Sequence, residues 1–179
     1  MKTSIVWFRR DLRLGDHPAL TAAAATADRV LPVFVLDGAL QSGTATRTDR
    51  LMASLSALSA DTSGALVLRS GDPAQVLTEL AAQVGADEVH VSTEVTPYGR
   101  SRDKRVADRL AAAGVKLVAT GSPYAVTPGL ITNGSGSPYR VFTPFSKAWR
   151  EYSWREPIPA PTVMWLDGVK SEQQLEHER

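Results

Sequence analysis

Five short apolar runs alternate with alanine-rich segments along the first 120 residues. Each run is apolar without interruption, which is typical of strands that are covered on both faces. The predicted strands span residues 4–8, 30–36, 65–69, 88–92 and 115–119. The intervals have helical patterns, at residues 16–27, 47–60, 72–84 and 101–113. The third helix is the best specified, because Asp72 suits its N-cap, Pro73 its first turn and Gly85 its end.

This alternation predicts the fold class. Strands that alternate with helices through short loops form a parallel sheet, because parallel strands need right-handed crossover connections. We therefore expect an α/β fold, doubly wound in three layers and Rossmann-like. In such sheets ligands bind beyond the carboxyl ends of the strands, where the strand order reverses.

Composition narrows the function classes. The 179 residues fit a single domain, and the absence of cysteine excludes a disulfide scaffold or a thiolate site. A formal net charge of +1 gives no general attraction to nucleic acid. The first apolar run is too short for a signal peptide or a membrane span, so we expect a soluble, cytoplasmic protein without a membrane partner.

Familiar catalytic motifs are missing. The chain has no glycine-rich dinucleotide loop, no phosphate-binding loop and no nucleophile elbow. His17, His90 and His177 are scattered without ligand spacing, and His90 is expected to pack inside a strand. We therefore assign no catalytic residue and no metal ligand.

The first strand runs directly into the charged sequence RRDLR at residues 9–13. If this strand is central, the arginines lie at the switch point together with Asp37 and Glu94. They form either a binding rim or an internal lattice of ion pairs, and both interpretations stay open. Within the lattice we expect Arg13 to pair with Asp11.

Two later segments also allow two interpretations. The basic helix after Tyr98 and Gly99, which are predicted to form a turn, is either a phosphate-binding face or a solvated helix with a Lys104–Asp108 pair. Aromatic residues recur at helical spacing from Phe142 to Trp154. Core or interdomain packing is the default for such a stripe, and base stacking is the alternative.

Four motifs together resemble one family. They are VWFRRDLRLGDHPAL, VFVLD, EVTPYGRSRD and GSGSPYRVFTPFSKAW, and they occur in the order and spacing of the N-terminal domain of DNA photolyases and cryptochromes. The resemblance covers residues 3–155 and is greatest to bacterial class I photolyases, which repair cyclobutane pyrimidine dimers. It implies a five-stranded parallel sheet in the order 3-2-1-4-5.

The resemblance also implies a function and a domain organisation. Residues 1–155 would be an antenna domain that binds a light-harvesting chromophore, and residues 156–179 would begin an interdomain linker. The antenna passes excitation to FAD in a following helical domain, which also binds damaged DNA and is absent from this sequence. The chain alone is then expected to be catalytically inactive, with that helical domain as its partner and with self-association through exposed aromatics as a further expectation.

The family's deazaflavin-binding members imply a set of site residues. The backbone after the second strand, an arginine that opens the next helix, and the acidic turn after the fourth strand hold the pigment there. The corresponding residues are Val35, Leu36, Asp37, Arg47 (with Arg50 as an alternative), Glu94, Val95, Thr96, Pro97, Tyr98 and Arg102, with Arg9 added at the switch point.

The identity of the ligand has alternatives. The resemblance favours 8-hydroxy-5-deazaflavin, with methenyltetrahydrofolate or FMN as other antennas. Ser92, Glu94 and Thr96 depart from the asparagine and two acids that relatives often carry there. Two other function classes remain: a repair enzyme, which would need FAD, and a nucleotide- or flavin-binding α/β module unrelated to light.

Overall fold

The computed structural model describes residues 1–40 and 44–172. Its strands are β1 (Thr3–Phe8), β2 (Arg29–Leu36), β3 (Val67–Ser70), β4 (Ala86–Val91) and β5 (Lys116–Ala119). Its helices are α1 (Pro18–Thr26), α2 (Ala45–Asp61), α3 (Pro73–Val84), α4 (Pro97–Ala112) and α5 (Phe142–Glu151), with a short 3-10 helix, η1 (Gly38–Leu40). His177 lies outside the described residues.

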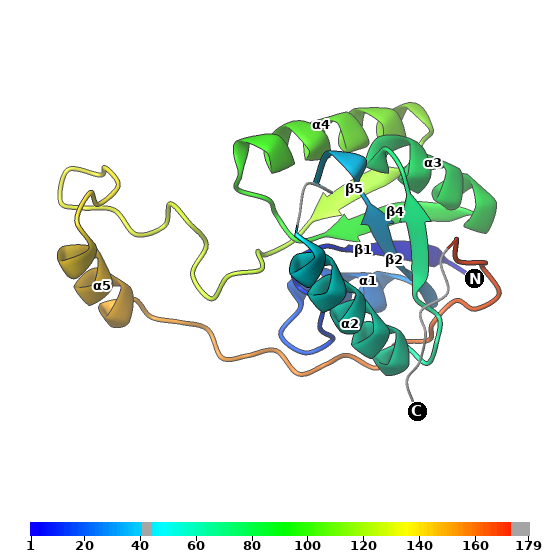
Figure 1. Ribbon diagram of the computed structural model, residues 1–179, viewed down its shortest axis with the longest axis horizontal. Coiled ribbons are helices and arrows are strands. Elements are labelled where there is room, and N and C mark those ends of the chain that lie inside the picture. Colours follow the sequence, from blue (N-terminus) through cyan, green and yellow to red (C-terminus); the bar gives the residue numbers. More distant parts are fainter. Residues whose placement is uncertain (41–43, 173–179) are drawn as a thin grey trace.

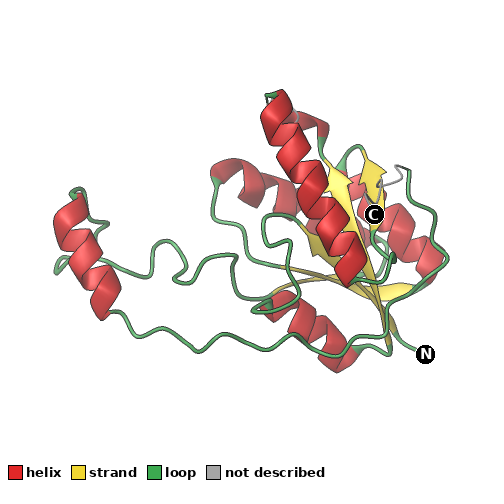
Figure 2. Cartoon of the chain, turned by 60° about the horizontal axis from the view of Figure 1, so that its bottom comes forward, coloured by secondary structure: helices red, strands yellow, loops and turns green. Residues whose placement is uncertain are grey.

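The five strands form one parallel sheet in the order β3-β2-β1-β4-β5. Helices α1 and α2 cover one face of this sheet, and α3 and α4 cover the other (Figures 1 and 2). The predicted fold class and strand order are therefore confirmed. The strand order reverses at β1, because the chain adds strands first on the β2 side and then on the β4 side.

Side chains from the central strands fill both halves of the core. In β1, Ile5 and Trp7 pack with residues of α3 and α4, whereas Val6 and Phe8 pack with residues of α1 and α2. Every residue of β1 is buried, which explains why its sequence lacks the polar alternation of a half-exposed strand. Because β1 is packed in the core, the position of the residues that directly follow it is also fixed.

Helix α4 begins four residues earlier than the sequence predicted. Pro97 occupies the first turn, and the side chain of Thr96 accepts a hydrogen bond from the backbone N–H of Gly99 at 3.2 Å. The predicted turn at Tyr98 and Gly99 is therefore wrong. Proline has no N–H to leave unpaired and its φ suits a helix, so it is favourable at the first helical position.

The sequence predicted the residues at both ends of α3 but not the N-cap of α1. Gly85 ends α3 in the left-handed conformation (φ 63°), as predicted, and Asp72 occupies the N-cap position but makes no side-chain capping bond. The cap of α1 was not predicted: Nδ1 of His17 accepts a hydrogen bond from the N–H of Leu20 at 3.1 Å. A histidine cap is hard to foresee, because serine, threonine, aspartate and asparagine are the usual capping residues.

The proline-rich segment that follows α5 returns along the domain. The carbonyl of Ile158 accepts a bond from the N–H of Asp16 at 2.7 Å, and the N–H of Leu166 donates to the carbonyl of Val30 at 2.9 Å. Farther on, the N–H of Glu172 donates to the carbonyl of Leu68 at 3.0 Å, along the outer edge of β3. The described part of the expected linker therefore covers an edge strand, and residues 173–179 lie outside the described residues.

Helix α5 stands apart from the rest of the domain on two extended arms (Figures 1 and 2). It has no buried residue, and Phe142 is 76% exposed. Of the two kinds of packing expected for this aromatic stripe, packing in the core of the described chain is wrong, and interdomain packing stays a prediction. Spacing identified the helix correctly, but spacing alone does not show which surface the apolar side meets.

Candidate functional site

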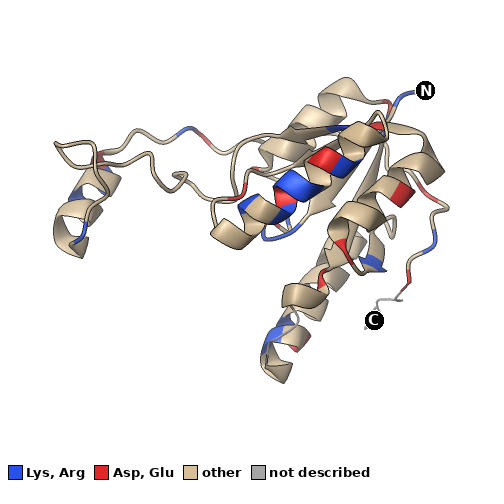
Figure 3. Ribbon diagram, turned by 90° about the horizontal axis from the view of Figure 1, so that it is seen from above, with Lys and Arg blue, Asp and Glu red and all other residues tan. Residues whose placement is uncertain are grey.

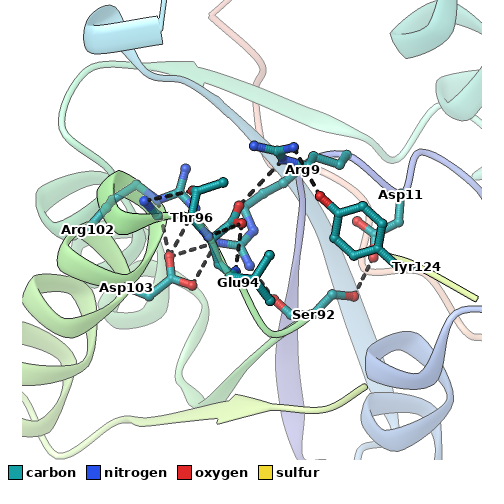
Figure 4. A network of polar contacts seen from close by, with 11 residues as sticks. Arg9, Asp11, Ser92, Glu94, Thr96, Arg102, Asp103 and Tyr124 are labelled. Atoms are coloured by element: carbon teal, nitrogen blue, oxygen red, sulfur yellow. Dashed lines mark hydrogen bonds and ion pairs between the residues drawn. The ribbon is translucent and has the colours of Figure 1, made fainter. Parts of the chain in front are cut away.

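The carboxyl ends of β1, β2 and β4 meet at the point where the strand order reverses. We call this region, together with the residues that directly follow the three strands, the carboxyl edge. It contains Arg9, Arg10 and Asp11 after β1, Asp37 after β2, and the 92–96 turn that leads from β4 into α4. Because the three strands are parallel and adjacent, segments far apart in sequence come together here (Figure 4).

Arg9 is bound within the protein. One guanidinium nitrogen lies 2.6 and 2.9 Å from the two carboxylate oxygens of Asp103, and the other donates to the carbonyl of Ser92 (Figure 4). The guanidinium carbon also lies 4.7 Å from the centre of the Trp7 ring. Burial lowers the pKa of Arg9, and Asp103 offsets part of that effect. Arg9 therefore stabilises the carboxyl edge through contacts within the protein.

Arg102 contacts Asp103 and Trp7, both of which also contact Arg9. Its side chain donates to Asp103 at 3.0 and 3.1 Å, and its guanidinium carbon lies 4.8 Å from the Trp7 ring centre. Only 4% of the residue is exposed. Trp7 is thus in contact with two guanidinium groups that share one carboxylate, so the lattice interpretation describes this half of the carboxyl edge.

Asp11 pairs with a different residue from the one predicted. Its carboxylate accepts a hydrogen bond from Ser92 Oγ and lies 3.3 Å from Nε2 of the fully buried His17. Arg13 instead lies near Asp16, with 3.7 Å between Arg13 Nη2 and a carboxylate oxygen. The predicted Arg13–Asp11 pair is wrong, because the chain turns after Asp11 and directs Arg13 toward the start of α1.

Glu94 closes the turn between β4 and α4. Its carboxylate accepts hydrogen bonds from the N–H groups of Val95 at 2.8 Å and Thr96 at 3.1 Å, and Arg10 Nε lies 3.5 Å away. Burial raises the pKa of Glu94, but the two backbone donors and the nearby arginines outweigh it and hold the pKa below its usual value. The charged carboxylate is therefore the stable form at neutral pH.

Asp37 and Tyr98 join the two sides of the carboxyl edge. The hydroxyl of Tyr98 donates to one oxygen of Asp37 at 2.5 Å, and the other oxygen accepts from the N–H of Ala39 at 3.1 Å. Burial and this hydrogen bond both raise the pKa of Tyr98. The bond links the end of β2 with the first turn of α4, which are 61 residues apart.

Strand β2 extends past the end of β1. The parallel register pairs Phe8 with Phe34, so Val35 and Leu36 have strand partners only in β3. Arg47 and Arg50 lie on the first turns of α2, and both are exposed. Backbone groups of β2 therefore lie beside the switch point, and two exposed arginines lie on the next helix. Their part in a binding site stays a prediction.

The outer face of α4 has mixed charge. Charges of both signs lie along this helix (Figure 3), and Lys104 Nζ lies 2.7 Å from a carboxylate oxygen of Asp108. Both side chains of that pair are mostly exposed. The predicted Lys104–Asp108 pair is confirmed, and the structure favours a solvated helix over a phosphate-binding face.

The structure brings Arg9, Asp37 and Glu94 to the carboxyl edge, and Tyr98 and Arg102 reach it from α4 through Asp37 and Asp103. Their role in binding a ligand stays a prediction. Sequence reasoning missed Trp7 and Asp103, through which both arginines are held. The RSRD sequence at residues 100–103 was a weak signal for Asp103. Nothing in the sequence signalled the position of Trp7 beneath the arginines, because an aromatic residue in a buried strand is ordinary core.

Comparison with known proteins identifies the family. The family model for DNA photolyase matches residues 4–162. The chain belongs to the DNA photolyase family. A deoxyribodipyrimidine photo-lyase of a Synechococcus strain is 36% identical over 166 residues, which cover 89% of this chain and 34% of the relative. The chain thus spans about a third of that photolyase's length.

Solved photolyase structures have the same fold. The bacterial class III photolyase of Agrobacterium tumefaciens is 31% identical, with a TM-score of 0.85 over 97% of this chain and 37% of its own. The archaeal photolyase of Sulfolobus tokodaii, solved with two FAD molecules, gives 24% identity and a TM-score of 0.80 over 94% of this chain and 40% of its own. The latter likeness shows the fold alone. The family resemblance read from the four motifs is confirmed.

Two further observations concern the described part of this photolyase-family chain. No group of three or more histidines and carboxylates there is arranged to hold a metal ion. Among the described helices, none combines the length and apolar character that crossing a membrane requires.

Proposed function

We propose that this chain is the antenna domain of a DNA photolyase and binds a light-harvesting chromophore at its carboxyl edge. In this role it supplies excitation energy to FAD held in a helical domain, where light-driven repair of cyclobutane pyrimidine dimers takes place. The chain alone is catalytically inactive in this proposal. The supporting observation is the convergence of Asp37, Glu94 and Tyr98 at the switch point of a family sheet.

Some of the described residues can bind a flat pigment that carries polar groups along its edge. The overhanging backbone at Val35 and Leu36 and the exposed guanidinium of Arg47 can hydrogen-bond to ring carbonyls and ring nitrogens. Arg50 is one turn farther along the same helix. Glu94 adds a fixed negative charge, and Asp37 and Tyr98 offer a carboxylate and a hydroxyl once their mutual bond opens.

The other expected site residues position neighbouring groups in this proposal instead of binding the pigment directly. Arg9 and Arg102 are held by Asp103, so they position the edge instead of contacting the pigment. Val95, Thr96 and Pro97 shape the turn that carries Glu94, and the backbone N–H groups of the first two hold its carboxylate. When bound, the pigment supplies light absorption and energy transfer.

Reconstitution tests this proposal. The purified chain is mixed with 8-hydroxy-5-deazaflavin, methenyltetrahydrofolate or FMN, separated from free pigment, and examined for a red-shifted absorption band. We expect the deazaflavin to bind, and Arg47→Ala to weaken binding by about tenfold, the loss of one charge-assisted hydrogen bond. Arg109→Ala, an exposed arginine in the last turn of α4, is the matched control and should leave binding unchanged.

Other outcomes would favour other functions. Tight binding of ATP or AMP without any pigment would support a nucleotide-binding module unrelated to light. Repair of dimer-containing DNA by the illuminated chain without added FAD would overturn the assignment of an inactive antenna domain.

A further inference from the structure

Exposed aromatic side chains gather on α5 and just beyond it. Phe142, Phe145 and Trp149 follow one another at helical spacing, and Trp154 packs against Trp149 with ring centres 4.4 Å apart. Phe142 is 76%, Phe145 36% and Trp154 48% exposed. We call these four residues the aromatic face. Contiguous exposed aromatics of this kind mark interaction sites, whereas single exposed apolar residues are normal.

This helix needs a surface to pack against. It has 10 residues, and isolated helices shorter than about 12–15 residues are marginal in water. Its own chain does not supply that surface, since α5 has no buried residue and both views place it away from the sheet and the other helices (Figures 1 and 2). Within the described residues Tyr139 contacts Phe145, but Phe142 stays 76% exposed, so most of the aromatic face is uncovered.

The position of α5 is shared with a longer photolyase. The Agrobacterium tumefaciens structure superposes on 97% of this chain, and the 10 residues of α5 exceed the 3% left uncovered. At least part of α5 therefore lies within the matched region. That structure contains a further 63% of chain beyond the shared part. The part of α5 that is matched is therefore compatible with the remainder of a photolyase.

Charge around the aromatic face argues against a second copy of this chain as the occupant. Arg140, Lys147 and Arg150 flank it, against the single acid Glu151. Arg155 is already 2.5 Å from a carboxylate oxygen of Asp16. Two copies that met through this face would bring like charges together, which weakens association. A complementary partner would offer an apolar groove with an acidic rim.

We infer that the aromatic face of α5 is the docking surface for the part of a photolyase that this chain does not span. Arms 120–141 and 152–162 hold α5 out so that its aromatic side enters that partner, while the basic residues meet its acidic rim. This inference rests on the proposed function, but it concerns assembly and not pigment binding.

A chimera tests the docking surface. This chain replaces the matching 37% of the Agrobacterium tumefaciens class III photolyase, and thermal unfolding is followed for the chimera and for the isolated chain. Phe142→Ser should lower the unfolding midpoint of the chimera by about 5 °C or more, because a buried aromatic anchor is lost. The same change should leave the isolated chain within about 1 °C, since Phe142 contacts solvent there.

Met164→Ser is the matched control, because Met164 is also a large exposed apolar residue, at 62%. It should affect chimera and isolated chain equally. Equal effects of Phe142→Ser in both proteins would overturn the inference, as would a chimera that does not fold. Sedimentation of the isolated chain should show a monomer, and a dimer abolished by Phe142→Ser would assign the face to a second copy instead. None of these measurements depends on pigment, so a failed reconstitution leaves them interpretable.

Discussion

Tyr98 donates a hydrogen bond to Asp37 across the carboxyl edge, with 2.5 Å between the hydroxyl and carboxylate oxygens. The bond connects the end of β2 to the first turn of α4, on the two sides of β1. Asp37 is 9% exposed, so its carboxylate depends on protein donors. The two residues thus fix the spacing of the edge where we propose that a pigment binds.

Removal of this hydroxyl should destabilise the protein modestly. Tyr98→Phe leaves one oxygen of Asp37 without its donor, and we expect a loss of about 1 kcal/mol in the free energy of unfolding, measured with urea. Tyr124→Phe is the control, because Tyr124 is also 37% exposed but its hydroxyl receives only a long bond, 3.4 Å, from Arg10. Equal losses in the two variants would show that the Asp37 bond contributes nothing specific.

The shared carboxylate of Asp103 should matter far more than the other aspartate of α4. Asp103→Asn leaves Arg9 and Arg102, both nearly buried, without a counter-charge, and we expect a loss of about 3 kcal/mol. Asp108→Asn removes an exposed pair with Lys104 and should change stability by less than about 0.5 kcal/mol. Denaturant unfolding of both variants measures the difference, and similar values would argue against an internal lattice.

Gly99 should tolerate no side chain. A Cβ there would overlap Cγ of Glu94 and lie 2.9 Å from Oγ1 of Thr96. Alanine normally stabilises a helix by about 0.5–1 kcal/mol relative to glycine. Here the displacement of Glu94 and Thr96 should reverse that sign and give a net loss of about 1 kcal/mol, the usual contribution of a cap. Gly15→Ala, with no atom within 4 Å of the added Cβ, is the control for thermal unfolding; a more stable Gly99→Ala would contradict this account.

Stability should fall in mild acid through His17. Burial lowers the pKa of this histidine, with the opposing effect of Asp11 too small to compensate. The unfolded chain therefore binds a proton more readily than the folded one at pH values between the lowered pKa and about 6.5. The contribution of His17 is fully present above that range and decreases as the pH falls through it.

His17→Asn tests this sign. Asparagine is a good N-cap residue that does not titrate, so it can retain the bond to Leu20 while removing the proton-binding site. The unfolding midpoint of the parent should fall more between pH 7.5 and pH 5.5 than that of the variant. His90, whose pKa burial also lowers, is present in both proteins and cancels in the comparison. Parallel pH profiles would refute the assignment.

Local sequence determined the elements and the sheet of this protein. Continuous apolar runs indicated strands covered on both faces, and their alternation with helices predicted a parallel sheet, which the structure confirms. The strand order was implied by the family resemblance and is confirmed as well. The same logic placed Arg9, Asp37 and Glu94 at one edge, because parallel strands end together. The four family motifs, in order, were sufficient for the family.

Tertiary structure alone decided which partner each charged group has and which side of α5 is covered. Asp11 faces His17 and Ser92 instead of Arg13, and Asp103 holds two arginines, because these pairings depend on distances between strands and helices that residue spacing does not encode. The aromatic stripe predicted a helix correctly, yet the structure leaves it exposed. Periodicity is a property of one helix, whereas burial is a property of the two surfaces that meet.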